Sequence, residues 1–148
     1  MSDEGSGAAL GRELLRRTIW AQDGRIAATP LSNAVGAQIG DCEAISDWAG
    51  QARPADYARF APMIVEHARR GDRLGLALVE EAAAAIAVMA QRLVALGSPG
   101  LCLVGGLAEP LRPWLPSSLD HAIVAPVSDA MDGAIALARQ AVSGGRVA

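Results

Sequence analysis

The apolar run Leu101-Cys102-Leu103-Val104 constrains the fold most strongly, because it ends in the glycine pair Gly105-Gly106. Four consecutive apolar residues predict a short strand that is buried on both faces. The two glycines let the backbone turn sharply, or let a ligand approach it closely. In open α/β sheets, ligands bind just beyond the carboxyl ends of such strands. A plain strand-to-helix turn, which needs glycine only for its dihedral angles, explains the pair equally well.

Helical patterns dominate the rest of the chain. The 148 residues are 51% hydrophobic but only 3% aromatic, which favours closely packed helices in one globular domain over residues 1–148. Helices are expected from the first glycines to about Trp20, twice between Pro30 and Arg53, from Pro54 onward but broken or kinked near Pro62, and from Ala130 to Val142. The longest should span about Asp72 to Leu96, with Asp72 as its cap. Its apolar stripe comprises Leu74, Leu78, Ala82, Ala85, Met89, Leu93 and Leu96.

A second short strand is predicted at Ala122-Ile123-Val124-Ala125. We therefore expect an α/β fold that is predominantly helical, with a small parallel sheet of about two strands joined by a right-handed crossover. Two parallel strands make a poor sheet by themselves. Either another chain completes this sheet, or the fold is mostly helical and the sheet is vestigial.

Composition excludes several classes of function. The chain has no lysine, which excludes a GxxxxGK[ST] phosphate loop and Schiff-base chemistry. A net charge of −3 without a basic block predicts no nucleic-acid partner. Cys42 and Cys102 lack metal-ligand spacing, as do the two histidines, and Cys102 is expected in the core. No secretory signal and no uncharged apolar run of about 18 residues is present, so we expect a cytoplasmic protein without a membrane partner.

Two stretches are candidate sites. In Asp3-Glu4-Gly5-Ser6-Gly7, carboxylates and exposed backbone N–H groups at a helix start suit a polyhydroxylated ligand or an anion. An ordinary helix cap explains the same stretch. The pair Gly105-Gly106, together with Gly133, would wall a flat aromatic ligand such as adenine. Glycine inside the last helix costs about 1 kcal/mol relative to alanine, so Gly133 indicates a close approach there.

An ordered set of segments carries a resemblance to a known family. The segments are Ser2–Ala8, Arg59-Phe60-Ala61-Pro62, Gly71-Asp72, Leu101–Gly106 and Asp132-Gly133-Ala134. The set resembles the C-terminal half of N-acetylglucosamine and glucosamine kinases, within the BadF/BadG-type ATPases of the actin-like sugar-kinase superfamily. The resemblance covers nearly the whole chain. It implies part of a ribonuclease-H-like lobe, with ATP and Mg²⁺ as cofactors of the complete enzyme and an amino sugar as substrate.

The resemblance also implies roles for individual residues. Asp3 matches a sugar-contacting aspartate and Glu4 adjoins it, while Ala61 and Gly106 match positions that line the nucleotide, with Gly105 and Gly133 beside it. The family's DxGxT turn, its catalytic aspartate and its GTGS-like turn have no match here, so no catalytic residue and no metal ligand is assigned. We expect a lobe that does not phosphorylate sugar alone.

Two other interpretations stay open. A BadF-type ATPase fragment requires cysteines for a bridging iron–sulfur cluster, and Cys42 and Cys102 do not fit that spacing. The second interpretation is a helical self-association module without catalysis. An incomplete sheet leaves apolar surface and strand edges uncovered, and self-association would cover them. On that ground we expect a homodimer.

Overall fold

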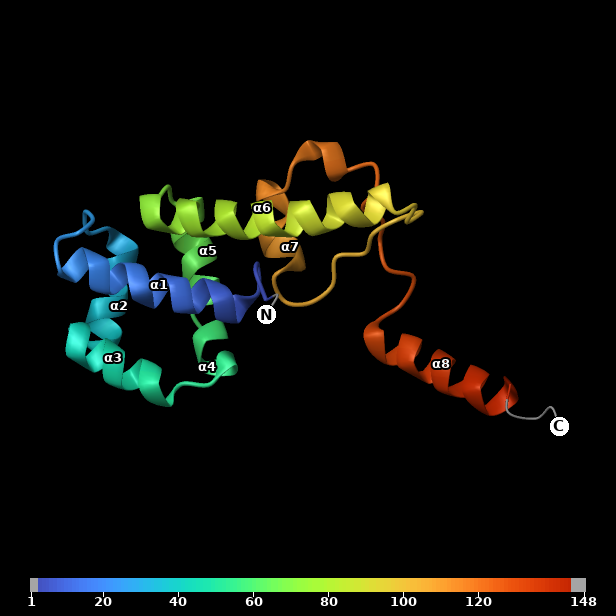
Figure 1. Cartoon of the computed structure of the whole chain (residues 1–148), viewed down its shortest axis with the longest axis horizontal. Coiled ribbons are helices and arrows are strands. Elements are labelled where there is room, and N and C mark those ends of the chain that lie inside the picture. Colours follow the sequence, from blue (N-terminus) through green and yellow to red (C-terminus); the bar gives the residue numbers. More distant parts are fainter. Residues whose placement is uncertain (1–2, 145–148) are drawn as a thin grey trace.

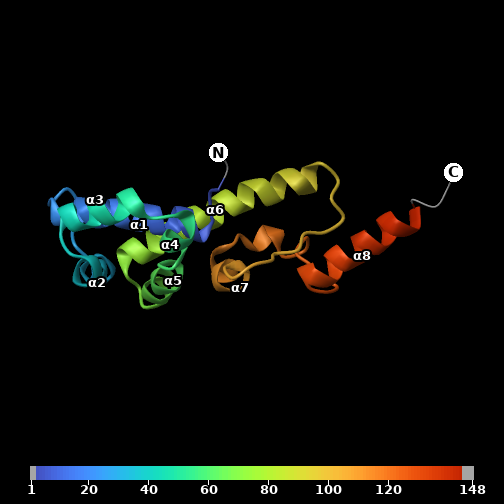
Figure 2. The ribbon, with the colours of Figure 1, turned by 90° about the horizontal axis from the view of Figure 1, so that it is seen from below.

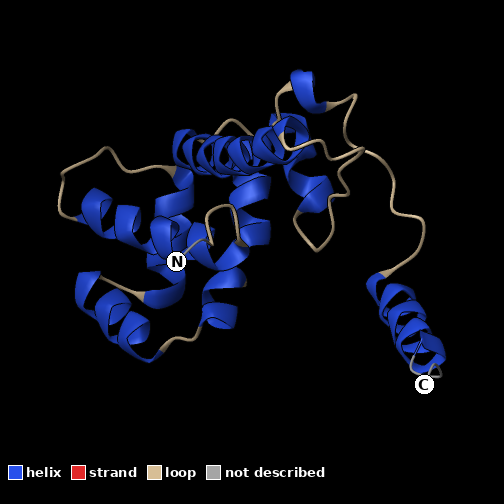
Figure 3. Cartoon of the chain, turned by 45° about the vertical axis from the view of Figure 1, so that its right-hand side comes forward, coloured by secondary structure: helices blue, strands red, loops and turns tan. Residues whose placement is uncertain are grey.

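The computed structural model describes residues 3–144, and helices account for its regular structure (Figures 1 and 3). The expected predominance of helices is confirmed. Within the described range, the α-helices are α1 (Gly7–Gln22), α2 (Pro30–Ile39), α3 (Cys42–Gln51), α4 (Pro54–Ala58), α5 (Ala61–Arg69), α6 (Arg73–Ala95), α7 (Ala108–Leu111) and α8 (Ala130–Gly144). Two 3-10 turns, η1 (Arg112–Trp114) and η2 (Ser117–Leu119), follow α7.

Four of the described α-helices, α1, α2, α3 and α6, begin at a side chain that accepts a capping hydrogen bond. The Oγ atom of Ser6 accepts a hydrogen bond of 3.1 Å from the backbone N–H of Ala9 at the start of α1. Asp72 caps α6, as the sequence predicted. The expected interruption near Pro62 is a break between α4 and α5, and Pro62 lies in the first turn of α5, where its missing N–H costs no helical bond.

The main core lies where α1, α2, α5 and the first half of α6 meet. Its largest fully buried side chains include Leu14, Leu31, Ile64 and Leu78. The helices approach closely, since a Cβ atom at Gly11 would lie 2.0 Å from the carbonyl oxygen of Tyr57. The glycine at this crossing thus lets the backbones of α1 and α4 approach closely.

The second half of α6 leaves the main core and is covered on one side only. Ala87 and Ala90 pack with Leu101, Leu119 and Ala122 in a second, smaller cluster. The predicted stripe instead emerges from the body: the exposed fractions are 45% for Met89, 49% for Leu93 and 65% for Leu96. The stripe is therefore buried in the core in the first half of α6 and exposed to solvent in the second half.

The expectation of a two-stranded sheet was wrong. Within residues 3–144 no strand forms, and the two predicted strands meet only in an isolated parallel bridge between Leu101 and Ile123 (Figure 3). The N–H of Leu101 donates to the carbonyl of Ala122 at 2.8 Å, and the N–H of Val124 donates to the carbonyl of Leu101 at 2.9 Å. Both segments have strand-like composition, but a strand also requires partners along its length.

Helix α8 projects away from the helical body in two perpendicular views (Figures 1 and 2). Its apolar residues are exposed, with Met131 at 69% and Val142 at 78%. Helix α6 is also long and apolar enough to cross a membrane, a property that core helices of soluble proteins share, and 44% of its apolar window is buried inside the structure.

Candidate functional site

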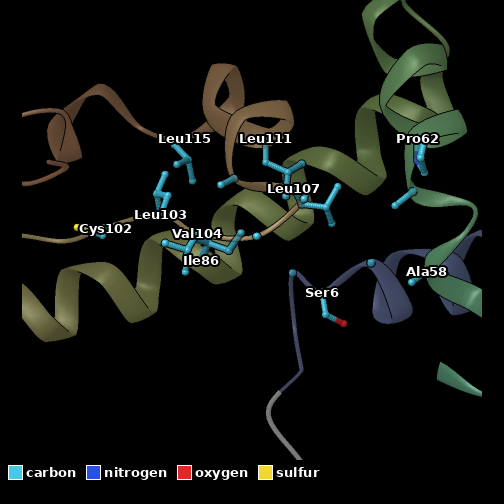
Figure 4. Close-up of a pocket in the computed structure, with 16 residues that line it drawn as sticks. Ser6, Ala58, Pro62, Ile86, Cys102, Leu103, Val104, Leu107, Leu111 and Leu115 are labelled. Atoms are coloured by element: carbon cyan, nitrogen blue, oxygen red, sulfur yellow. The ribbon is translucent and has the colours of Figure 1, made fainter. Parts of the chain in front are cut away.

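A cavity of about 640 Å³ lies where the turn before α1 faces the loop that follows the Leu101–Ile123 bridge (Figure 4). The start of α5 and the middle of α6 complete its walls. The residues that line it are Gly5, Ser6, Gly7, Ala58, Ala61, Pro62, Ile86, Cys102, Leu103, Val104, Gly105, Gly106, Leu107, Ala108, Leu111 and Leu115. Segments about a hundred positions apart in the sequence thus share one cavity.

Gly5 fixes the turn on one side of this cavity. Its φ angle is +82°, a left-handed conformation that favours glycine. A Cβ atom at this position would lie 2.8 Å from Cγ1 of Ile86 on α6. Both the backbone conformation and the space therefore require glycine, and the turn is seated directly on α6.

Gly105 and Gly106 form the opposite side of the cavity and are exposed. Gly105 has a φ angle of +100°, and its carbonyl accepts a hydrogen bond of 3.1 Å from the N–H of Ala108 as the chain turns toward α7. No described atom lies within 4 Å of a Cβ built on Gly106. The pair borders open space, so a ligand has direct access to this backbone.

The cavity is suited to an uncharged, largely apolar group. None of the residues that line it carries a charge, and most are aliphatic or glycine. Ser6 caps α1 at its edge, and Gly7 begins the 16-residue helix there. The first N–H groups of a helix lack partners within the helix and carry partial positive charge, which adds polar donors at one end of an otherwise apolar cavity.

A second, charged groove of about 420 Å³ lies between α1 and α6 and shares Gly5 with the cavity. Glu4 lines it. Arg17 joins the helices there, because its Nη2 atom lies 2.7 Å from a carboxylate oxygen of Glu81, while its Nε donates to Glu13 at 2.7 Å. The apolar cavity and the charged groove therefore adjoin at one residue.

The ionised state of Glu13 is stabilised in this groove. Burial opposes ionisation, but hydrogen bonds from Arg16 and Arg17 outweigh it and hold the pKa of Glu13 below its usual value. The same pairing acts on Arg17, whose pKa is raised by Glu81 and Glu13 against the opposing effect of burial. The groove thus keeps a fixed pattern of opposite charges near neutral pH.

The structure brings most of the predicted site residues together. Ala61, Gly105 and Gly106 line the apolar cavity, and Glu4 lines the adjoining groove. The Asp3 carboxylate is exposed and lies 3.8 Å from Nη1 of Arg12, which belongs to that groove.

Gly133 stands apart from this group. It lies on α8, outside both the cavity and the groove, and a Cβ built on it meets no described atom within 4 Å. The expected pairing of Gly133 with Gly105-Gly106 is absent from the described arrangement. No group of three or more His, Cys, Asp and Glu side chains that could hold a metal ion occurs within residues 3–144.

Several lining residues escaped the sequence patterns. Ile86 lies within a helix, so its pattern alone indicates no cavity wall; only the crossing of the first turn over α6 reveals it. Cys102 was expected in the core, but it is exposed and lines the cavity. The alternation of side chains along its segment turns Leu101 inward and Cys102 outward.

Comparison with known proteins supports the motif-based resemblance, although no protein-family model matches the chain. Glucosamine kinase GspK of Vibrio cholerae is 38% identical over 139 residues, which are 93% of this chain and 47% of that kinase. A crystal structure from Chromobacterium violaceum, assigned as an N-acetylglucosamine kinase, superposes with a TM-score of 0.83 at 38% identity, over 91% of this chain and 47% of that one. The chain spans about half the length of these relatives, and its resemblance to the C-terminal half of amino-sugar kinases is confirmed.

Proposed function

We propose that this chain forms one wall of the nucleotide cleft of an ATP-dependent amino-sugar kinase. Such an enzyme transfers the γ-phosphoryl group of ATP to a hydroxyl of glucosamine or N-acetylglucosamine in the cytoplasm, where ATP is plentiful. The observation that carries the proposal is the uncharged cavity between Gly5 and Gly106, in a chain 38% identical to a glucosamine kinase.

The adenine base and ribose are the parts of ATP that suit this cavity. Its walls are aliphatic side chains and glycine backbone, which a planar aromatic ring contacts without desolvating a charge. Ala61 from α5 and Gly106 from the opposite loop would contact the two faces of the ring. Gly133 lies outside this cavity, and we assign it no contact with the base.

The amino sugar is assigned to the charged side of the shared turn. Carboxylates accept hydrogen bonds from hydroxyl and ammonium groups, and Asp3 and Glu4 precede the turn at Gly5, where the cavity and the groove adjoin. A sugar held by these carboxylates would lie next to a nucleotide in the cavity. Proximity of this kind is the main requirement for phosphoryl transfer.

Magnesium does not fit the residues that line the cavity. None of them is a carboxylate, and Mg²⁺ is bound in proteins through carboxylates, substrate phosphates and water. In the complete enzyme the ion would be held by the nucleotide and by residues outside this chain. We therefore expect this chain to bind the nucleoside part of ATP but not to phosphorylate sugar alone.

Cys102 provides a direct test, because its exposed thiol lines the cavity. In a Cys42→Ser variant, Cys102 is the one remaining thiol of the chain. Its reaction rate with an aromatic disulfide reagent should fall in a saturable manner as ATP or adenosine is added. Because these 148 residues form one wall of the proposed cleft, we expect them to bind with a dissociation constant of roughly 1 mM, about 4 kcal/mol of binding free energy.

Two controls separate base binding from other effects. Inorganic tripolyphosphate should slow the reaction far less than adenosine does, since the cavity offers no cationic side chain and only the N–H groups at the start of α1 would contact it. The single thiol of the Cys102→Ser chain should be insensitive to adenosine. An unchanged Cys102 rate at 10 mM adenosine, about ten times the expected dissociation constant, would contradict the assignment of the cavity. Sugar phosphorylation by the isolated chain would contradict its assignment as a partial enzyme.

A further inference from the structure

A further cavity of about 670 Å³, which we call the α3–α5 cavity, lies beside the junction of α4 and α5. Its walls come from the end of α2 and from α3, α4 and α5. At the junction, Arg59 and Phe60 line this cavity, whereas Ala58, Ala61 and Pro62 on either side of them line the apolar cavity. The two cavities are thus separate but share one short segment of backbone. A cavity of this volume is large enough for a small molecule.

One part of the α3–α5 cavity is apolar. Trp48 on α3 packs edge-on against Tyr57 and Phe60, with ring centroids 5.2 and 5.5 Å away. The Tyr57 hydroxyl donates a hydrogen bond of 3.1 Å to the carbonyl of Ala49, which ties this aromatic cluster to α3. Trp48 and Met63 line the cavity and are only half-buried. An apolar group of a ligand would therefore gain burial against them.

Two opposite charges line the same cavity. Arg59 is exposed, and its guanidinium forms no hydrogen bond or ion pair within residues 3–144. Oδ2 of Asp56 accepts a hydrogen bond of 2.9 Å from the backbone N–H of Arg53, which leaves Oδ1 as an acceptor for a ligand. That hydrogen bond and the charges of Arg53 and Arg59 outweigh burial and hold the pKa of Asp56 below its usual value. Both charges are therefore present at neutral pH.

This lining discriminates between classes of ligand. An organic anion would pair with Arg59 but would be repelled by Asp56, and an organic cation would meet the reverse problem. A sugar would place hydroxyl groups against Ile39 and Met63, which offer no hydrogen bond. A small zwitterion with an apolar side chain satisfies both charges and the apolar part together.

We propose that the α3–α5 cavity binds a free amino acid with an apolar side chain, and that this amino acid is an effector of the apolar cavity. The ligand's carboxylate pairs with Arg59, its ammonium group with Asp56, and its side chain packs against Trp48. Phe60 is 5% exposed and Ala61 3% exposed, so in this close-packed segment a ligand that displaces Phe60 also shifts Ala61. The binding site rests on the structure alone, whereas the effector role rests on the proposed function.

Methionine methyl groups provide the test, because Met63 lines the α3–α5 cavity while Met89 and Met131 lie elsewhere. The chain is labelled with ¹³C at its methionine methyl groups and titrated with phenylalanine, and the Met63→Leu variant identifies the Met63 signal. The aromatic ring should shift the Met63 signal in a saturable manner, with a dissociation constant of roughly 1 mM, and leave the other two signals in place. An unmoved Met63 signal at about 10 mM phenylalanine, or equal shifts of Met89 and Met131, would overturn the proposal.

Two analogues test whether both charges are read. 3-Phenylpropionate lacks the ammonium group and phenethylamine lacks the carboxylate, so each should bind about tenfold more weakly than phenylalanine. Equal binding of all three compounds would show that the cavity holds only the ring and would overturn the assignment to an amino acid. A shift of Met63 by glucosamine in place of phenylalanine would assign the cavity to a sugar, with the same consequence.

A substitution at Arg59 tests the carboxylate contact. Arg59→Gln should weaken phenylalanine binding about tenfold, leave phenethylamine binding unchanged and leave the melting temperature unchanged, since the Arg59 guanidinium has no partner within residues 3–144. Arg69→Gln is the matched control, because it removes the same charge from an exposed position of α5 outside the cavity. Equal weakening in the two variants would mean that net charge, rather than a contact with Arg59, governs binding, and would overturn the proposal.

The effector role is tested on the same Met63 signal. Adenosine at about 10 mM should change the dissociation constant of phenylalanine at least about twofold, because coupling between two sites is reciprocal. An unchanged constant would overturn the effector role. Loss of adenosine protection at Cys102 would instead contradict the proposed function and leave the Met63 shifts intact, so the two failures are distinguishable.

Discussion

The backbone N–H of Leu31 donates a hydrogen bond of 2.8 Å to Oδ2 of Asp72, which joins the start of α2 to the start of α6. The other carboxylate oxygen, Oδ1, accepts from the N–H groups of Leu74 at 2.9 Å and Gly75 at 3.1 Å. Asp72 is only 7% exposed. One buried carboxylate thus accepts hydrogen bonds at the starts of two helices that are far apart in the sequence.

Replacing Asp72 with alanine should lower the free energy of unfolding by about 2–3 kcal/mol, because it leaves buried N–H groups at both helix starts without an acceptor. Urea unfolding followed by circular dichroism measures the loss. Asp41→Ala is the matched control: Asp41 caps α3 with a single hydrogen bond to the N–H of Ala44 at an exposed site, so about 1 kcal/mol is expected. Equal losses in the two variants would show that Asp72 is only a cap.

The same carboxylate should make stability depend on pH. Burial opposes ionisation of Asp72, but hydrogen bonds from Gly75, Leu31 and Thr29 outweigh it and hold the pKa of Asp72 below its usual value. The folded chain therefore binds fewer protons than the unfolded chain, and stability rises with pH. This contribution is complete above about pH 4, the ordinary pKa of aspartate, and is lost as the pH falls through the lower pKa of the folded state.

Urea unfolding between about pH 6 and pH 3 measures this dependence. Asp72→Asn removes the titrating group and should flatten the acid side of the stability profile. If the free energy of unfolding falls equally with acid in the parent chain and in Asp72→Asn, the acid sensitivity comes from other carboxylates, such as Glu13, whose pKa is also lowered.

The sequence predicted those features that depend on neighbouring residues. The cap at Asp72, the length of α6 and the accessible glycines at 105–106 all follow from local pattern. The two strands did not form because the pattern at Leu101–Val104 indicates strand composition, whereas a strand requires hydrogen-bonding partners that residues 3–144 do not supply. Ile86 joined the site only through the crossing of the first turn over α6, which no local pattern encodes.

Two glycines in helices should respond oppositely to alanine. At Gly11 a Cβ atom would lie 2.0 Å from the carbonyl oxygen of Tyr57, so α1 and α4 must separate, and we expect Gly11→Ala to cost about 2–3 kcal/mol. Gly50 lies on α3 with no described atom within 4 Å of its Cβ position, so Gly50→Ala should stabilise by up to about 1 kcal/mol. Thermal unfolding of both variants checks the difference; similar melting temperatures would contradict the close crossing.

The two thiols should differ in reactivity. Cys102 is exposed, whereas Cys42 is half-buried and its Sγ atom lies 3.2 Å from Oε1 of Gln22. Burial, followed by the neighbouring carboxylate of Asp23, raises the pKa of the Cys42 thiol and so lowers its thiolate fraction. Under limiting reagent at pH 8, about half a unit below the ordinary thiol pKa, Cys102 should be modified first. Peptide mapping identifies the labelled residue, and preferential labelling of Cys42 would refute this ranking.

Gly106 and Gly105 provide the sharpest mutational test of the cavity. Open space surrounds the Cβ position of Gly106, so Gly106→Leu should fold with a free energy of unfolding within about 0.5 kcal/mol of the parent chain. The added side chain would fill the space assigned to the adenine base. We expect adenosine protection of Cys102 to weaken about tenfold, equivalent to about 1.4 kcal/mol.

Gly105→Ala separates occlusion of the cavity from backbone strain. Gly105 has a φ angle of +100°, so alanine there should cost about 1–2 kcal/mol of stability while adding only one methyl group to the cavity. A stable Gly106→Leu chain that still gives full adenosine protection would move the nucleotide away from this glycine pair. Weakened protection in Gly105→Ala alone would instead show that the conformation of the turn, rather than the open space beside it, determines nucleotide binding.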